Sequence, residues 1–160
     1  MPPVAREFRI AEMAGEDPEV AALLVDLALD EQEHFAHPHE TREEVERRLR
    51  VAPTFTGENH LLVARDRRCH AVGVCWVVLF DPGTGLEGEI AELYVRPEAR
   101  GSGVARSLVT EAVALLRRHV VSFACVWTRD DNPTALRAYR AAGFAATEQM
   151  VLTWLPISDG

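Results

Sequence analysis

A junction between an apolar strand and an apolar helix constrains the fold of this chain more than any other feature. Gly101-Ser102-Gly103 lies between the strand pattern of Glu89–Val95 and a helical stripe of apolar residues that starts at Val104. Glycines at such a place let the backbone approach a ligand closely, and the free N–H groups of a first helical turn attract phosphate. The sequence therefore predicts an α/β fold with a phosphate-binding site at this junction.

Two common classes of phosphate loop do not fit this junction. A Walker loop needs a lysine followed by serine or threonine after its last glycine, and all 17 basic residues of the chain are arginines. A dinucleotide-binding fingerprint would need a small residue where Arg106 stands. It would also need a tight turn directly after the strand, in place of the intervening residues 96–100. Both classes are therefore disfavoured.

The hydrophobic patterns predict one domain over residues 1–160, because a chain of 160 residues can bury one proper core. Asp17-Pro18 and the capping-box pair Thr41 and Glu44 indicate two helix starts. The expected elements are a strand near 8–10, helices at 17–35 and 41–49, strands at 60–66, 69–80 and 89–95, a helix from 104, a strand at 120–127, a helix at 134–142 and β structure at 144–155. This β-α-α-β-β-β-α-β-α-β order predicts a mixed sheet with helices on both faces.

The acidic charge of the chain is concentrated in its first third. Residues 1–50 hold 13 acidic residues and 6 arginines, a net charge of −7 out of −8 for the whole chain. So acidic a surface argues against nucleic acid as a partner. No apolar run approaches the roughly 20 residues that cross a bilayer, and the first residues lack the basic end and apolar centre of a signal peptide. We therefore expect a soluble, cytoplasmic protein with no membrane partner.

The cysteines and histidines indicate neither a disulfide framework nor a metal site. Cys69, Cys75 and Cys125 are widely spaced and form no C-x-x-C pair, so we interpret them as small core residues. The tightest group of histidines lies within residues 34–39, and we interpret it as part of a polar loop between two helices. No metal is expected.

Two motifs carry a resemblance to a known family. The first crosses the junction and reads Leu93-Tyr94-Val95-Arg96-Pro97-Glu98-Ala99-Arg100-Gly101-Ser102-Gly103-Val104-Ala105. The second follows downstream as Asn132, Ala135, Tyr139 and Gly143-Phe144, with the spacing Asn-x-x-Ala-x-x-x-Tyr-x-x-x-Gly-Phe. In this order the two motifs resemble the acyl-CoA signature and the following helix of the GCN5-related N-acetyltransferase (GNAT) family. The resemblance covers about residues 60–155.

The resemblance implies a GNAT-like fold with a central mixed sheet of six or seven strands, and acetyl-CoA as the co-substrate. The CoA pyrophosphate would be held by backbone N–H groups at the positive end of the helix dipole. The residues expected there are Arg100, Gly101, Ser102, Gly103, Val104, Ala105 and Arg106. The preceding strand would be bulged and pair with pantetheine through Leu93, Tyr94 and Val95, with the Val95 N–H polarising the thioester carbonyl. Asn132 and Ala135 would complete these contacts, although helix capping alone also explains an asparagine before Pro133.

Acetyl transfer to an amine needs a proton acceptor, because an ordinary alkylamine with a pKa of about 10.4 is mostly protonated at neutral pH. Glu92 or Glu89 is the candidate base, acting directly or through water. Strict alternation puts the two on opposite faces of a strand unless a bulge intervenes, and Glu92 is favoured. Tyr139 occupies the position of the family's general acid toward the leaving thiolate, and packing on the cofactor is the alternative. A covalent acetyl-enzyme through Cys125 is a minor alternative to direct attack.

The resemblance implies an N-acetyltransferase that moves an acetyl group from acetyl-CoA to a primary amine in a ternary complex. In this family the first two helices usually overhang the acceptor site, and here they carry the acidic charge. We therefore expect a cationic acceptor, either a small-molecule amine or a protein amine. The alternative is a non-catalytic acyl-CoA sensor or interaction domain of the same fold. Family members often pair through the last strands, so a homodimer is also an expectation.

Overall fold

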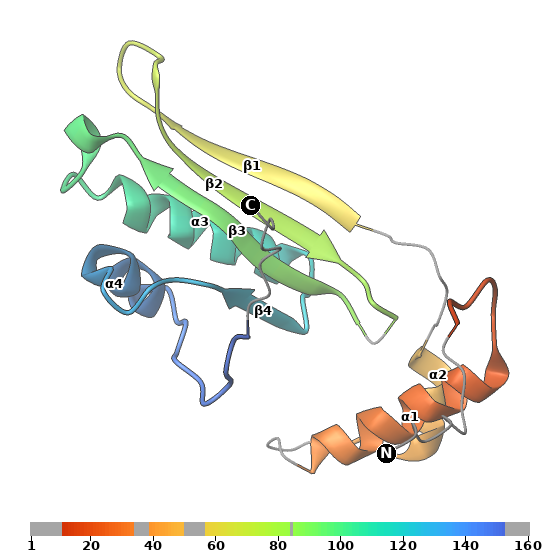
Figure 1. The fold of residues 1–160 in the computed structure, drawn as a ribbon. Helices are drawn as coiled ribbons and strands as arrows, with labels where there is room; N and C mark the ends of the chain where they lie inside the picture. The colour runs from red at the N-terminus through yellow and green to blue at the C-terminus, as the bar shows by residue number, and fades with distance from the viewer. Residues whose placement is uncertain (1–10, 34–38, 50–56, 84, 153–160) are drawn as a thin grey trace, which may run out of the picture.

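The computed structural model describes residues 11–33, 39–49, 57–83 and 85–152. The elements within these ranges are α1 (Pro18–Gln32), α2 (Arg42–Arg48), β1 (Gly57–Arg65), β2 (Ala71–Phe80), β3 (Glu87–Val95), a short 3-10 helix η1 (Pro97–Ala99), α3 (Val104–Arg118), β4 (Phe123–Val126) and α4 (Pro133–Ala141). Figure 1 shows one twisted sheet with α3 along one of its faces and α4 beside α3.

The described strands form one mixed sheet in the order β1-β2-β3-β4. The first three strands are antiparallel neighbours, as expected for segments joined by short turns. β4 runs parallel to β3 because α3 provides the crossover between them. The mixed α/β class is therefore confirmed, whereas the described residues contain four strands in place of six or seven.

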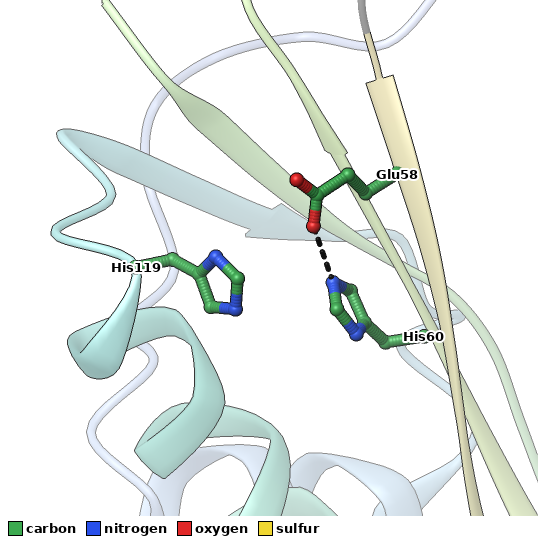
Figure 2. A group of neighbouring side chains, drawn as sticks. All are labelled: Glu58, His60 and His119. Atoms are coloured by element: carbon green, nitrogen blue, oxygen red, sulfur yellow. Dashed lines mark hydrogen bonds and ion pairs between the residues drawn. The ribbon is translucent and has the colours of Figure 1, made fainter.

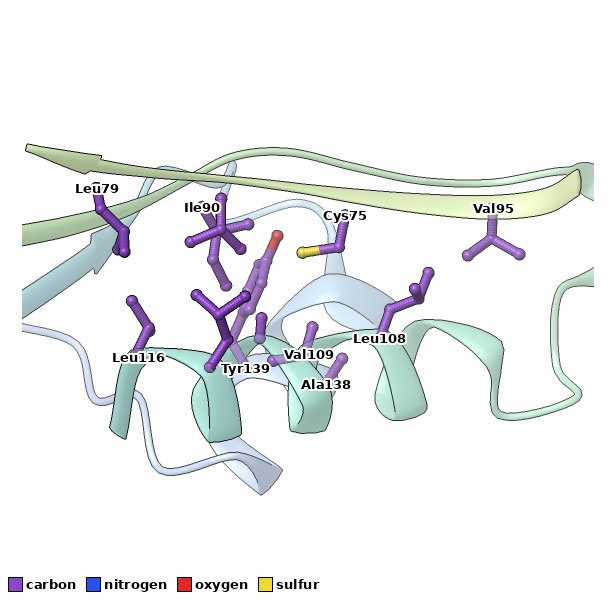
Figure 3. Packing of buried hydrophobic residues seen from close by; sticks show 12 residues of the cluster. Cys75, Leu79, Ile90, Val95, Leu108, Val109, Leu116, Ala138 and Tyr139 are labelled. Atoms are coloured by element: carbon purple, nitrogen blue, oxygen red, sulfur yellow. The ribbon is translucent and has the colours of Figure 1, made fainter. Parts of the chain in front are cut away.

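The core lies between the sheet and α3. Apolar residues of α3 recur at helical spacing, so its stripe faces the sheet. Figure 3 shows Cys75, Leu79 and Ile90 pointing from the sheet toward this helix. Leu79 is only 1% exposed, and Gly88 leaves room for Leu116, whose Cδ2 would lie 2.5 Å from a Cβ at that position. This packing holds the last turn of α3 against the start of β3.

The two N-terminal helices pack on each other around a second, smaller cluster. It is formed by Val25, Val45 and Leu49. Asp17 caps α1, accepting from the Glu19 N–H at 2.9 Å, and Thr41 and Glu44 form the expected capping box at α2. Figure 1 shows this pair beyond one end of the sheet, so it does not provide the expected second helical layer over the sheet.

A β-bulge interrupts β3 in the expected region. Glu92 pairs with Trp76 in β2 and Ile90 pairs with Val77, so Ala91 is the extra residue. Glu89 lies opposite Val78, on the same face of the sheet as Trp76. The bulge therefore brings Glu89 and Glu92 to the same face, and both are turned away from α3.

Three expectations about local structure are wrong. The strand expected at 120–127 is limited to Phe123–Val126, because the backbone turns at Val120 with a φ of 54°. Residues 144–152 of the predicted 144–155 strand form no strand. The predicted strand near 8–10 and residues 153–155 lie outside the described residues, so they are not among these three. Cys69 is exposed in the β1–β2 turn, with a φ of 66°, so it is not a core residue, unlike Cys75.

Within the ranges that the structure describes, the helices are all too short or too polar to cross a bilayer.

Candidate active site

The site begins where β3 and β4 separate. Their parallel pairing covers only residues 87–90 of β3 and 123–126 of β4. After Ile90 the bulge changes the direction of β3, while the chain after Val126 turns away from β3 and leads to α4. The part of β3 from Ala91 to Val95 therefore has an edge that does not pair with β4, and two adjoining cavities open there.

The larger cavity has a volume of about 910 Å³ and lies between the end of β3, the start of α3 and one face of α4. It is lined by Leu93, Tyr94, Val95, Ala99, Arg100, Gly101, Gly103, Val104, Ala105, Arg106, Asn132, Thr134, Ala135, Arg137, Ala138 and Ala141. All the residues predicted to bind the cofactor are among them except Ser102 and Tyr139. The two sequence motifs therefore meet around one cavity, although they are far apart in the chain.

The loop before α3 is shaped by its two glycines. Gly101 and Gly103 have φ angles of 77° and 86°, in the left-handed region that other residues rarely adopt. Gly103 is the N-cap of α3 and offers no side chain to bond the first N–H groups of the helix. These donors and the positive end of the helix dipole thus face the larger cavity, which suits an anionic group such as a phosphate.

Side chains in this loop hold the backbone in place. Arg100 donates from Nε to the Val95 carbonyl at 3.0 Å, and its guanidinium lies 5.9 Å from the centre of the Tyr94 ring. Ser102 donates from Oγ to the Ala99 carbonyl at 2.5 Å. Ser102 therefore orders the loop from within, which explains why its side chain is not part of the cavity wall.

Asn132 has a structural role at the start of α4. Its side-chain oxygen accepts from the Ala135 N–H at 3.2 Å, so it is the N-cap of the helix, and Pro133 follows at the first helical position. Asn132 and Ala135 line both cavities. The cap thus fixes the end of α4 that separates the two spaces.

The smaller cavity, of about 240 Å³, contains the predicted proton-transfer residues. Glu92 and Tyr139 both line it, together with Ile90, Ala91, Leu93, Trp127, Thr128, Arg129, Asn132 and Ala135. Glu92 is exposed, whereas Tyr139 is 6% exposed and its ring lies 5.9 Å from that of Phe144. Figure 3 shows the Tyr139 hydroxyl directed toward the sheet. Glu89 lines neither cavity and lies beside Cys125 of β4.

The environments of Tyr139 and Cys125 favour their neutral forms. Burial, reinforced by the charges of Cys75 and Glu92, raises the pKa of Tyr139 to about 12. The phenol is therefore protonated at neutral pH and able to donate. Burial also raises the pKa of the Cys125 thiol, against a hydrogen bond from Trp127, so Cys125 is poorly suited to act as a nucleophile.

The raised pKa of Tyr139 predicts a loss of stability at alkaline pH. The folded protein keeps the phenol proton up to a pH of about 12, whereas the unfolded chain loses it near 10. The free energy of unfolding should therefore fall as the pH rises above about 10. Urea unfolding of the wild type and of Tyr139→Phe at a series of pH values would measure this. A parallel decline in both proteins would contradict the raised pKa.

Several residues around the larger cavity were not predicted from the sequence. They are Ala99, Thr134, Arg137, Ala138 and Ala141, most of them on α4. The small side chains leave space for a ligand, and Arg137 adds a positive charge. Helical spacing from Asn132 and Ala135 was the available signal, because residues three or four positions apart share one face of a helix.

The acidic helices are not part of either cavity wall. No residue of α1 or α2 lines the larger or the smaller cavity in the described part of the chain. The expectation that these helices overhang the acceptor site is therefore not met in this structure.

Comparison with known proteins identifies the family. The sequence model of the Acetyltransferase (GNAT) family matches residues 22–144. The chain belongs to this family. Its curated GNAT relatives include mycothiol acetyltransferases from Thermobispora bispora, 31% identical over 124 residues, and Sanguibacter keddieii, 34% identical over 123 residues. Each alignment covers 74% of this chain, but only 41% and 38% of the relatives. The chain thus spans about two fifths of the length of these relatives.

Solved structures show the same GNAT fold at low sequence identity. An aminoglycoside acetyltransferase from an uncultured soil metagenomic sample, in complex with sisomicin, is 17% identical with a TM-score of 0.53. The match covers 88% of this chain and 89% of that one. An integron cassette protein from V. cholerae is 16% identical with a TM-score of 0.54, covering 92% of this chain and 93% of that one.

Proposed function

We propose that this GNAT domain is an acetyl-CoA-dependent N-acetyltransferase that acetylates a primary amine of a small molecule. The observation that carries the proposal is the pair of adjoining cavities that share Leu93, Asn132 and Ala135. The larger cavity presents helix N–H donors for phosphates, and the smaller one presents a carboxylate and a phenol for proton transfer. A thioester placed where the cavities meet would lie between cofactor and acceptor.

The larger cavity suits CoA in size and in charge. The pyrophosphate would bind the N–H groups at the start of α3, with Arg100 and Arg106 nearby. The pantetheine arm would run along the edge of β3 at Leu93–Val95, which β4 leaves uncovered. Arg137 is a further cation for a phosphate group.

The proposed reaction is direct attack by the amine in a ternary complex. Glu92 accepts a proton from the ammonium form of the acceptor, directly or through water, and frees the nitrogen lone pair. The nitrogen then bonds to the acetyl carbon, the carbon–sulfur bond breaks, and CoA thiolate leaves. Tyr139 donates a proton to this thiolate and regains one from the acetylated nitrogen, directly or through water, while the Val95 N–H stabilises the oxyanion. Glu92 is favoured over Glu89 because Glu92 lines the smaller cavity.

Support for a small, cationic acceptor comes from the site and from the names of the relatives. Glu92 lies in the wall of the smaller cavity and would attract an ammonium group. The compounds that appear in the names of similar proteins, mycothiol and aminoglycosides, are small molecules. Glu92, and not the acidic helices α1 and α2, is therefore the basis for proposing a cationic acceptor.

Cofactor binding and turnover test the proposal separately. Titration calorimetry should show acetyl-CoA binding, and a panel of amines should yield acetylated products by mass spectrometry. Arg137→Gln should weaken CoA binding about 10-fold through loss of a charged hydrogen bond. Arg140→Gln is the matched control, because Arg140 is on the same helix but does not line the cavity. Binding without turnover of any amine would indicate an acyl-CoA sensor, and absence of binding would refute the assigned cavity.

A further inference from the structure

Three potential metal ligands meet at the end of α3 that is remote from the cavities. Glu58 and His60 come from β1, and His119 is the C-cap of α3. One ligand atom from each of the three side chains lies within 4.8 Å of the other two. Figure 2 shows the three side chains directed toward one another across the space between strand and helix.

The backbone explains why these residues converge. Glu58 and His60 are two positions apart on a strand, so both project from the face of β1 that is turned toward α3. α3 ends at His119, and Val120 then turns the chain with a φ of 54°, a conformation that is rare for a β-branched residue. The imidazole of His119 is thereby held over the edge strand, with its ring centre 5.1 Å from that of His60.

We propose that Glu58, His60 and His119 bind a divalent transition metal ion of the zinc class, with water completing the coordination. Two imidazoles and one carboxylate are ligands typical of Zn²⁺, which binds them at about 2.0–2.2 Å in tetrahedral geometry. Ligand atoms in such a site lie about 3.4 Å apart. The three ligand atoms lie within 4.8 Å of one another, so side-chain rotations would have to close at most about 1.4 Å for metal binding.

The contact between His60 and Glu58 is compatible with metal binding. His60 Nε2 lies 3.0 Å from Glu58 Oε2, so the two atoms already face each other, and a metal ion would replace the proton that they share. The carbonyl end of α3 adds the negative end of a helix dipole, which favours a cation. Arg118, next to His119 in the chain, is paired with Glu111, about two helical turns earlier.

The ion would join the sheet edge to the helix end, outside the proposed reaction. α3 has 15 residues and is about 22 Å long, and the larger cavity lies at its opposite end. Bound metal would therefore clamp β1 to α3 and stabilise the domain without contacting acetyl-CoA. This cluster of ligands could not be found from sequence spacing, because residues 58–60 and 119 are far apart in the chain.

Calorimetric titration of the tag-free, chelator-treated protein with Zn²⁺ tests the site. We expect one site per chain, and a melting temperature that rises with Zn²⁺ concentration. Co²⁺ should bind with the visible absorption of a tetrahedral complex. His119→Ala and His60→Ala should each raise the Kd for Zn²⁺ at least about 100-fold. Even the loss of a side chain that only hydrogen-bonds to a metal ligand lowers metal affinity about 10–100-fold. Glu58→Gln should weaken binding as well.

Two control variants make the result specific. His70→Ala removes an exposed histidine of the β1–β2 turn, and His39→Ala removes one from the N-terminal region; both should bind Zn²⁺ as the wild type does. Circular dichroism would establish that every variant is folded. The proposal is overturned if the wild type binds no Zn²⁺ tighter than about 1 mM, or if folded His60→Ala and His119→Ala bind like the wild type.

Discussion

Replacing Tyr139 with phenylalanine should lower kcat for acetyl transfer about 100-fold, at the lower end of the range for general acid catalysis. The expected loss is limited because burial raises the pKa of Tyr139 to about 12, well above that of a thiol, so the phenol is a weak acid for this step. Binding of acetyl-CoA should change little, since Tyr139 does not line the larger cavity. Steady-state kinetics and calorimetry would measure the two quantities independently.

A second variant distinguishes proton donation from packing. Phe144→Leu alters the ring contact with Tyr139 but keeps the hydroxyl group. It should lower the melting temperature and leave kcat within a few-fold of the wild type. Equal turnover by Tyr139→Phe and the wild type would remove the proposed general acid, whereas a large kcat loss in Phe144→Leu would indicate that packing accounts for the effect.

Leu79→Ala should cost about 2–5 kcal/mol of unfolding free energy, the largest stability effect expected for a single substitution here. Leu79 is 1% exposed and packs between the sheet and α3, so its removal leaves a cavity in close-packed surroundings. Urea denaturation monitored by circular dichroism would give the difference directly.

Leu61→Ala is the control for this core substitution. Leu61 is also a strand leucine, but it is 56% exposed on the face of the sheet that α3 does not cover. Its truncation should cost less than about 1 kcal/mol. Similar losses in the two variants would mean that the outer face of the sheet is covered in solution.

The sequence predicted the helix starts and the glycine loop that lines the larger cavity well, because local chemistry determines both. Capping by Asp17 and by the Thr41–Glu44 pair depends on residues within one turn. The glycines at 101 and 103 similarly mark backbone conformations that other residues rarely adopt. Such signals need no knowledge of the rest of the fold.

Features that depend on distant contacts were predicted less well. The strand pattern after Phe144 forms no strand in the described residues, because apolar alternation shows only that a segment could pair and not that a partner edge is present. Arg137 was missed for a related reason: an arginine on a helix is usually solvated, and only the placement of α4 turns it toward the cavity.

The bulge at Ala91 changes how substitutions along β3 should be interpreted. Before it, the residues that face α3 have even numbers, Gly88 and Ile90; after it they have odd numbers, Leu93 and Val95. A mutational scan of this strand should therefore show tolerance that alternates with a period of two and reverses phase at residue 91. In an alignment, a gap of one residue misplaced here would exchange the positions that face α3 with those that face away, including the proposed base Glu92, even where the neighbouring residues are identical.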